Sequence, residues 1–420
     1  MSIRINQEGN MMTTKKLTIK QSILWNSWGS LIYLGVQWLQ TVLVARLLGY
    51  EDAGIFSLAM SVTNIFYALS IYGMRNFQVS DIEEKYTADN YVVSRVVTGA
   101  GAFVLCVGFT ILNKYNFQQT ICIIAYMLFK LSETIFDVFS GFYQKRWRMD
   151  ILGKSMTMRA IIMLCIFPGV MVVTQNLLSA IVSMAIGVFC VILFYDIKKT
   201  RELETFELNV EGDKVLRLLV ECFPLAIYLV LTTSIGSIPR YFLEIYQGSE
   251  KLGIYASVAT PTLIVQMAAT YIFNPMVTVF AECLNRKDKK QFVKTLFQCL
   301  IITATVSVVA LAGGKIFGRI GLFILYGEGI VEYEYLLIPL IICTITTAFV
   351  WLFCGILTVT RNFKALLVGN GCALLFSIVL SMVLIPRWEM QGATYALLLG
   401  NVVGIIISVY YIIKDIKKIR

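Results

Sequence analysis

The chain has 420 residues, of which 58% are hydrophobic and only 15% charged, and its mean hydropathy is +0.74. A soluble protein carries about 25% charged residues, so this composition excludes a soluble enzyme and indicates a polytopic membrane protein. The apolar runs are long and do not alternate, which favours helices over a β-barrel. The sequence has no His, and its ten Cys lack metal-binding spacing, so we expect no metal site and no cofactor.

Twelve apolar segments are long enough to cross a bilayer, which takes about 20 residues as a helix. The polar stretch before the first of them does not resemble a cleavable signal peptide. The predicted spans are 22–45, 54–74, 93–112, 119–142, 157–174, 177–195, 216–240, 253–280, 294–314, 336–359, 365–385 and 392–413.

The Lys and Arg residues predict which side of the membrane each link faces. With the N-terminus inside, 28 of the 36 fall in cytoplasmic segments and seven in outer segments. This bias places both termini in the cytoplasm. It also accounts for the net charge of +10 without a nucleic-acid partner.

A polar segment divides the chain into two halves. Residues 196–215 follow the sixth span, and we interpret them as a cytoplasmic linker between two six-helix lobes, 21–195 and 216–413. Because six is even, both lobes enter from the same side, which makes them parallel repeats. The remaining predicted parts are cytoplasmic tails, 1–20 and 414–420. The expected fold is therefore an all-α polytopic membrane protein with about twelve transmembrane helices in two parallel lobes.

One short pattern occurs twice. Residues 49–56 and 248–255 both read Gly-x-Glu-x-x-Gly-Ile-aromatic, at an offset of 199. Each copy follows the first span of its lobe, so we expect an outer hairpin at 46–53 and another at 241–252. Further outer links are predicted at 315–335 and 386–391.

The fourth span carries three charged residues, Lys130, Glu133 and Asp137, on one face of the expected helix. Each charge costs about 2.5–3.5 kcal/mol in a membrane, so this face cannot point at lipid. One interpretation is a polar path in which Glu133 or Asp137 binds a cation or proton and Lys130 is the counter-charge. The other is an internal Lys130–Glu133 salt bridge that only holds helices together.

Three arginines are candidates for an anionic headgroup. Arg46 and Arg240 lie at the outer ends of spans one and seven, and Arg75 lies on the inner side. The planar guanidinium can bind two phosphate oxygens. The alternative for the two outer arginines is contact with lipid headgroups from the ends of their spans.

The sequence shows no complete enzyme signature. Gly153-Lys154-Ser155 is similar to the end of a phosphate-binding loop, but position 148 is Arg where the first Gly is needed. The outer link 315–335 has three glutamates but little room for a catalytic site.

The doubled pattern and its flanks resemble a known family. Arg46-Leu47-Leu48-Gly49 followed by Gly54-Ile55-Phe56, and Ile238-Pro239-Arg240-Tyr241-Phe242 followed by Leu252-Gly253-Ile254-Tyr255, are similar to signatures of polysaccharide biosynthesis proteins. These are the Wzx-type flippases of O-antigen, capsule and exopolysaccharide units, within the multidrug/oligosaccharidyl-lipid/polysaccharide exporter superfamily. The resemblance covers essentially the whole chain.

The resemblance implies a V-shaped pair of bundles around a cationic cavity in the cell membrane. Such carriers move undecaprenyl-diphosphate-linked oligosaccharides to the outer leaflet by alternating access, with Na⁺ or H⁺ as coupling ion, alongside other membrane proteins of polysaccharide assembly. Arg46, Arg240, Arg75 and Lys130 are the candidates here for headgroup binding, and Glu133 and Asp137 for coupling.

Two other functions stay open at this point. A drug/cation antiporter of the same superfamily would use an acidic cavity, which Glu133 and Asp137 could supply. A membrane-embedded glycan polymerase or ligase would extend the sugar chemically instead of moving it. A lipid II flippase, a closer relative, usually has two more spans than this chain can hold.

Overall fold

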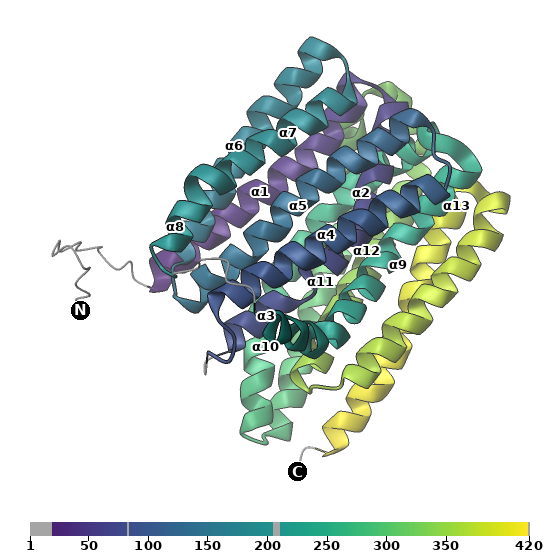
Figure 1. Cartoon of the computed structure of the whole chain (residues 1–420). Helices are drawn as coiled ribbons and strands as arrows, with labels where there is room; N and C mark the ends of the chain where they lie inside the picture. The colour runs from purple at the N-terminus through teal and green to yellow at the C-terminus, as the bar shows by residue number, and fades with distance from the viewer. Residues whose placement is uncertain (1–18, 82–83, 205–210, 419–420) are drawn as a thin grey trace.

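The computed structural model describes residues 19–81, 84–204 and 211–418, and this part of the chain is helical with no strand (Figure 1). The first half contains α1 (Ile19–Leu47), α2 (Tyr50–Ile71), α3 (Met74–Ser80), α4 (Ala88–Leu112), α5 (Phe117–Lys145), α6 (Met149–Thr174), α7 (Leu177–Val191) and α8 (Ile197–Arg201), the last two joined by π-helical Ile192–Asp196. The second half contains α9 (Gly212–Ala259), α10 (Leu263–Asn285), α11 (Lys289–Tyr326), α12 (Leu337–Val359) and α13 (Phe363–Lys418). Short 3₁₀ turns precede α10 and α12.

Two of these helices are broken. In α9, Gly248 adopts φ 82° and ψ 172°, and in α13, Glu389 adopts φ 46° and ψ −124°. Each break lies in a predicted outer link, 241–252 or 386–391, so these links are tight turns between nearly continuous helices. The predicted link 315–335 is wrong for its first part, since α11 runs on to Tyr326.

The predicted cytoplasmic segments are also more helical than expected. The linker 196–215 is helical at both ends, because α8 extends to Arg201 and α9 begins at Gly212. The C-terminal tail 414–420 continues α13 to Lys418, and its last two residues lie outside the described part. The N-terminal tail 1–20 lies outside it up to residue 18.

The protein is an all-α, multi-pass membrane protein. Nine helical stretches in the described ranges are long and apolar enough to cross a membrane; α5, which carries Lys130, Glu133 and Asp137, is not among them. Large apolar side chains are exposed on the outside of the bundle, such as Leu112 (81%) and Val104 (68%), while Arg95 and Arg159 are buried at 1% and 0% exposure. This arrangement, with apolar side chains outside and charged ones inside, is the reverse of that in a soluble protein. It suits a lipid solvent, in which charge must face the interior. The count of twelve crossings stays a prediction.

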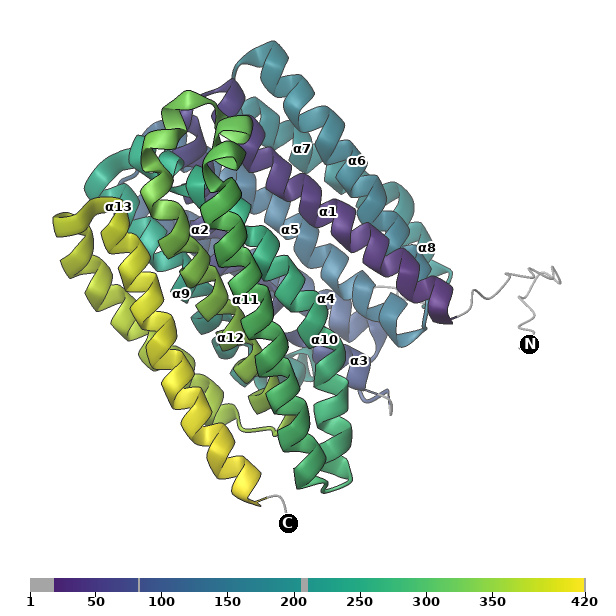
Figure 2. The ribbon, with the colours of Figure 1, turned by 180° about the vertical axis from the view of Figure 1, so that it is seen from behind.

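The two halves of the chain lie side by side. The purple-to-teal helices α1 and α4–α8 occupy one side and the green-to-yellow helices α10–α13 the other, in both views (Figures 1 and 2). Helices α2 and α9 pack against each other between them.

The doubled pattern forms part of this α2–α9 contact. Its first glycines share one backbone conformation, φ 95° and ψ 179° at Gly49 and φ 82° and ψ 172° at Gly248, which side chains with a Cβ rarely adopt. Its second glycines, Gly54 and Gly253, let the two copies touch. A Cβ on Gly54 would lie 1.7 Å from the Ser249 carbonyl oxygen, and one on Gly253 would lie 1.8 Å from that of Tyr50. Tyr50 and Ser249 are equivalent at the offset of 199, so the contact is reciprocal.

Candidate functional site

A cavity of about 560 Å³ lies between α2 of the first half and α9, α10, α12 and α13 of the second. Hydroxyl and amide side chains supply much of its polar lining, from both halves of the chain. They include Ser61, Asn64, Thr233, Ser237, Thr344 and Asn401. Tyr228 and Trp351 add aromatic surface. Such a lining offers many neutral donors and acceptors and can orient a polyhydroxylated molecule.

Arg240 is the one charged residue among the described residues that line this cavity. It follows Pro239 in α9 and is half-buried. Within the described ranges, its guanidinium makes no hydrogen bond or ion pair. A guanidinium that no described residue binds and that lines a polar cavity is suited to an anionic ligand, which its fork can bind through two oxygens.

Arg46 does not reach this cavity. Its Nε donates to the Leu325 carbonyl oxygen and its Nη2 to that of Ile324, both at 2.6 Å. These carbonyls belong to the last turn of α11, where the helix leaves them without partners of its own. Arg46 therefore ties the end of α1 to the end of α11, and the structure does not bring Arg46 and Arg240 together.

Lys130 is buried, with 9% exposure, and lies over aromatic rings. Its Nζ is 4.9 Å from the centre of the Tyr67 ring and 5.7 Å from that of Tyr126. The alternative interpretation, an internal Lys130–Glu133 salt bridge, is not what the described residues form: Glu133 Oε1 instead accepts a hydrogen bond from Arg159 Nη1 at 2.9 Å. Residues three apart on one helix can pair, but Lys130 lies against the rings while Arg159 reaches Glu133 from the neighbouring helix α6.

Arg159 lies between two carboxylates. Its Nη2 donates to Asp196 Oδ2 at 3.1 Å, and its guanidinium carbon sits 3.7 Å from the centre of the Phe136 ring. Asp196 also accepts from Ser155 Oγ at 3.0 Å. The Gly153-Lys154-Ser155 run thus belongs to helix α6, and its Ser155 takes part in an ion-pair cluster in the first half of the chain.

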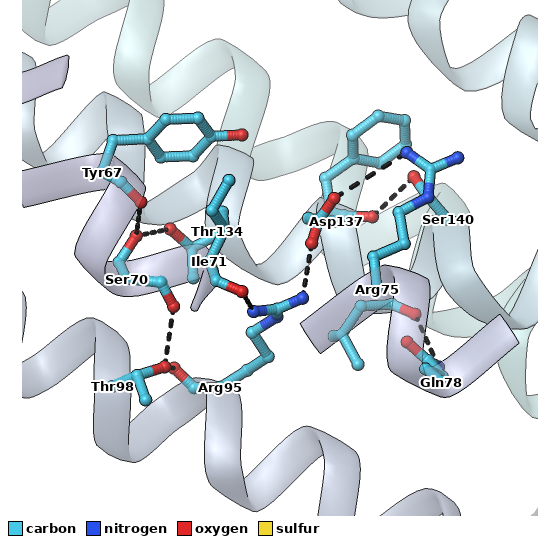
Figure 3. Close-up of polar contacts among 12 residues, drawn as sticks. Tyr67, Ser70, Ile71, Arg75, Gln78, Arg95, Thr98, Thr134, Asp137 and Ser140 are labelled. Carbon is cyan, nitrogen blue, oxygen red and sulfur yellow. Dashed lines mark hydrogen bonds and ion pairs between the residues drawn. The ribbon is translucent and has the colours of Figure 1, made fainter. Parts of the chain in front are cut away.

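Asp137 faces two arginines (Figure 3). Arg95 Nη2 donates to Asp137 Oδ2 at 2.5 Å, and Arg75 Nη1 lies 3.8 Å from Asp137 Oδ1. Arg95 also donates to the carbonyl oxygen of Ile71, the last residue of α2. Asp137 and Arg95 therefore fix the point where α2 ends, before the left-handed residues Tyr72 and Gly73 lead into α3.

Hydrogen bonds between helices continue this network. Thr98 Oγ1 donates to the Ser70 carbonyl oxygen at 2.7 Å, and the Ser70 and Thr134 hydroxyls lie 2.6 Å apart (Figure 3). Helices α2, α4 and α5 are thereby joined at one level, close to Asp137.

The sequence interpretation missed Arg95, Arg159 and Asp196. Both arginines were counted as inner-side charges that set topology, yet they are buried partners of the charged face of α5. Their positions in the sequence could have indicated burial, because each arginine lies two residues inside the start of a predicted span, 93–112 or 157–174. In the part of the chain that the structure covers, no group of three His, Cys, Asp or Glu residues is placed to hold a metal ion.

The model of the polysaccharide biosynthesis protein family matches residues 19–284. The chain belongs to this family. The capsular polysaccharide biosynthesis protein CapF of Staphylococcus aureus is 25% identical over 386 residues, which cover 89% of this chain and 94% of that protein.

Solved structures share the fold. The lipid II flippase MurJ in an inward closed conformation matches with a TM-score of 0.72 and 14% identity, over 94% of this chain and 90% of that one. An inward-facing multidrug resistance MATE family transporter of the MOP superfamily matches with a TM-score of 0.70 and 11% identity, over 95% and 98%. At such low identity, these likenesses concern the fold alone.

Proposed function

We propose that the protein is a flippase of the cell membrane. It moves an undecaprenyl-diphosphate-linked oligosaccharide from the inner to the outer leaflet for capsule or related surface polysaccharide synthesis. The single observation that carries this proposal is the cavity with Arg240 as its one charged lining residue in the described part of the chain. Membership of the polysaccharide biosynthesis family and similarity to CapF support the same function.

The chemistry of such a substrate fits the cavity. A diphosphate cannot cross hydrocarbon unaided, because transferring an unpaired charge out of water is strongly unfavourable. Arg240 would bind the diphosphate, and the hydroxyl and amide lining would take up sugar hydroxyls. The volume of about 560 Å³ lies in the usual range of about 300–1,000 Å³ for ligand sites. The isoprenoid tail has no need of a protein site, since it can stay in lipid.

In this proposal, other positively charged side chains would help to attract or bind the diphosphate. Lys130 is buried against aromatic rings, forms no ion pair within 4 Å among the described residues, and adds a positive charge to the first half of the chain. Arg75 keeps about a third of its side chain exposed and could attract a headgroup arriving from the inner side. Arg46 is the weakest of the four candidates, because its donors already bind helix carbonyls.

The coupling role of Glu133 and Asp137 stays a proposal. Both carboxylates are already paired with arginines, so a proton or Na⁺ would act by displacing Arg159 or Arg95 rather than by filling an open site. The variants Glu133→Gln and Asp137→Asn test it. Unchanged ion-driven transport in both variants and in the double variant, at equal protein amounts, would exclude the role.

The alternative functions are less well supported. A drug/cation antiporter needs an acidic cavity, and no Asp or Glu belongs to the described lining. A polymerase or ligase is disfavoured because the solved structures that share the fold are a flippase and a transporter rather than enzymes.

The test is a flipping assay in vesicles with a fluorescent lipid-diphosphate oligosaccharide. Losing a charge-assisted hydrogen bond costs about 1.5–3 kcal/mol, so Arg240→Gln should weaken substrate affinity roughly 10- to 150-fold. The exposed Arg387, in the same half of the chain, provides the matched control Arg387→Gln. Equal transport by both variants would refute the role of Arg240. Chemical extension of the sugar without its movement would refute the flippase function.

A further inference from the structure

Glu244 is a buried carboxyl group at the contact between the two halves of the chain. It lies in α9, four residues before the break at Gly248, and is 7% exposed. Its Oε1 accepts hydrogen bonds from Gln119 Nε2 of α5 at 2.5 Å and from Ser249 Oγ at 2.7 Å. The partners thus come from both halves, and Glu244 is a direct link between them.

The second oxygen of this carboxyl group has no partner among the residues that the structure describes. Glu244 Oε2 is buried and accepts no hydrogen bond from the described residues. None of the ion pairs in the described ranges includes Glu244, and the nearby Lys251 pairs with Glu389 at 3.8 Å. A carboxylate buried in this way, with no cation and one unbonded oxygen, is strongly disfavoured, and such a group normally becomes neutral by taking up a proton.

The titratable groups that face Glu244 make a negative charge there still less favourable. On α2 the facing group is the carboxylate of Glu51, and between α4 and α5 it is the hydroxyl of Tyr115. On its own helix, Tyr241 donates its hydroxyl to Asn113 Oδ1 and gives Glu244 no hydrogen bond. None of these elements presents a positive charge to Glu244 among the described residues.

Glu244 lies inside the contact at which the two halves of the chain are packed together. The reciprocal approach of Gly54 and Gly253 lies at the same junction, one turn beyond Ser249. Beyond the end of α9, the Thr260 carbonyl oxygen accepts a hydrogen bond from Trp38 Nε1 of α1 at 2.9 Å, which adds another link between the halves. Separating the halves would therefore expose Glu244 to water, where a carboxylate is the stable form near neutral pH.

We propose that Glu244 is a proton-binding site that couples protonation to closure of this contact. The closed contact holds a neutral Glu244 carboxyl, and opening releases its proton to water as the carboxylate becomes hydrated. Since each opening event releases one proton, the open population rises with pH, by up to tenfold per pH unit. The proposal rests on the flippase function only for its use in transport; the linkage itself is a property of this contact.

Hydrogen exchange of the full-length protein in nanodiscs tests the linkage. After correction for the intrinsic effect of pH on exchange, amides of residues 249–259 should lose protection as the pH rises above about 4, where a hydrated Glu carboxyl ionises, by up to tenfold per unit. Glu244→Gln, which mimics the neutral group, should abolish this pH dependence. The matched control is Glu250→Gln, which makes the same change at an exposed position of the same segment and should behave as the unmodified protein.

A second variant keeps the test decisive if Glu244→Gln does not fold. Gln119→Leu removes the amide donor to Oε1. Because that donor stabilises the charged form of Glu244 in the closed contact more than the neutral form, its loss should raise the pH at which the increase in exchange levels off. Exchange that does not depend on pH in the unmodified protein, or an undiminished pH dependence in Glu244→Gln, would overturn the proposal. Intact linkage without flipping in vesicles would refute the transport function and leave the proton site standing.

Discussion

Replacing Gly54 with Ala should separate the two halves of the chain at their closest contact. The new Cβ would lie 1.7 Å from the Ser249 carbonyl oxygen, where ordinary contacts begin at 3.4 Å. The α2 and α9 backbones would therefore have to move apart by roughly 1.7 Å, because neither a carbonyl nor a Cβ can rotate away. The same argument applies to Gly253, whose Cβ would meet the Tyr50 carbonyl oxygen at 1.8 Å.

The magnitude follows from two opposing effects. Overpacking of a tight contact costs about 1–3 kcal/mol, while Gly to Ala in a helix gains about 0.5–1 kcal/mol from backbone entropy. Here the full overlap must be relieved by movement of whole helices, so the upper part of the overpacking range applies. We expect a net loss of about 1–2 kcal/mol in the closed contact, a shift of roughly 5- to 30-fold toward open states.

Gly108 supplies the control. It lies in helix α4 with no atom within 4 Å of an added Cβ, so Gly108→Ala should be neutral or stabilising by about 0.5–1 kcal/mol. Hydrogen exchange of residues 249–259 measures the effect: exchange should accelerate in Gly54→Ala and in Gly253→Ala but not in Gly108→Ala. Equal protection in all three variants would refute the idea that these glycines set the contact.

Three further predictions concern the charged groups. Arg159→Gln leaves Glu133 and Asp196 buried without their cation and should destabilise the protein by about 3–5 kcal/mol; a melting temperature in detergent equal to that of the unmodified protein would contradict this. Arg46→Gln should speed hydrogen exchange at the end of α11 while leaving substrate affinity unchanged; weaker substrate binding with unchanged exchange would instead support a headgroup role. Partial burial opposes ionisation of Asp81, but hydrogen bonds from the Lys85 and Tyr86 backbone and from Tyr91 outweigh it and lower the pKa of Asp81. This stabilisation of the Lys85 and Tyr86 backbone is therefore present above about pH 4 and is lost as the pH falls through the lowered pKa. Asp81→Asn should remove that acid transition from hydrogen exchange, and its persistence would exclude Asp81 as the cause.

Much of the fold followed from local information. Continuous apolar runs predicted membrane helices, and the doubled pattern predicted a turn after the first helix of each half; the shared conformation of Gly49 and Gly248 bears out that local reading. Helix ends were less predictable. The helix α11 passes through Gly313 and Gly314 and continues for twelve residues beyond Gly314, to Tyr326, because its neighbours support it there.

For the candidate site, the sequence predicted which charged residues of α5 lie within the bundle but not which residues they contact. Spacing along one helix correctly placed Lys130, Glu133 and Asp137 within the bundle, but it suggested the wrong partner for Glu133. The arginines that satisfy the carboxylates come from α4 and α6, and a pattern within one helix holds no information about which neighbour faces it.

By itself, the sequence determined that the chain enters the membrane as helices and that one eight-residue pattern occurs twice, because hydropathy and a 199-residue offset are properties of the linear chain. Only the tertiary structure decided that Gly54 and Gly253 meet each other, that Arg240 faces a polar cavity while Arg46 caps α11, and that Glu244 is buried between the halves. These outcomes depend on the distance and crossing of helices far apart in sequence. Packing of whole surfaces fixes that geometry, and no local spacing can encode it.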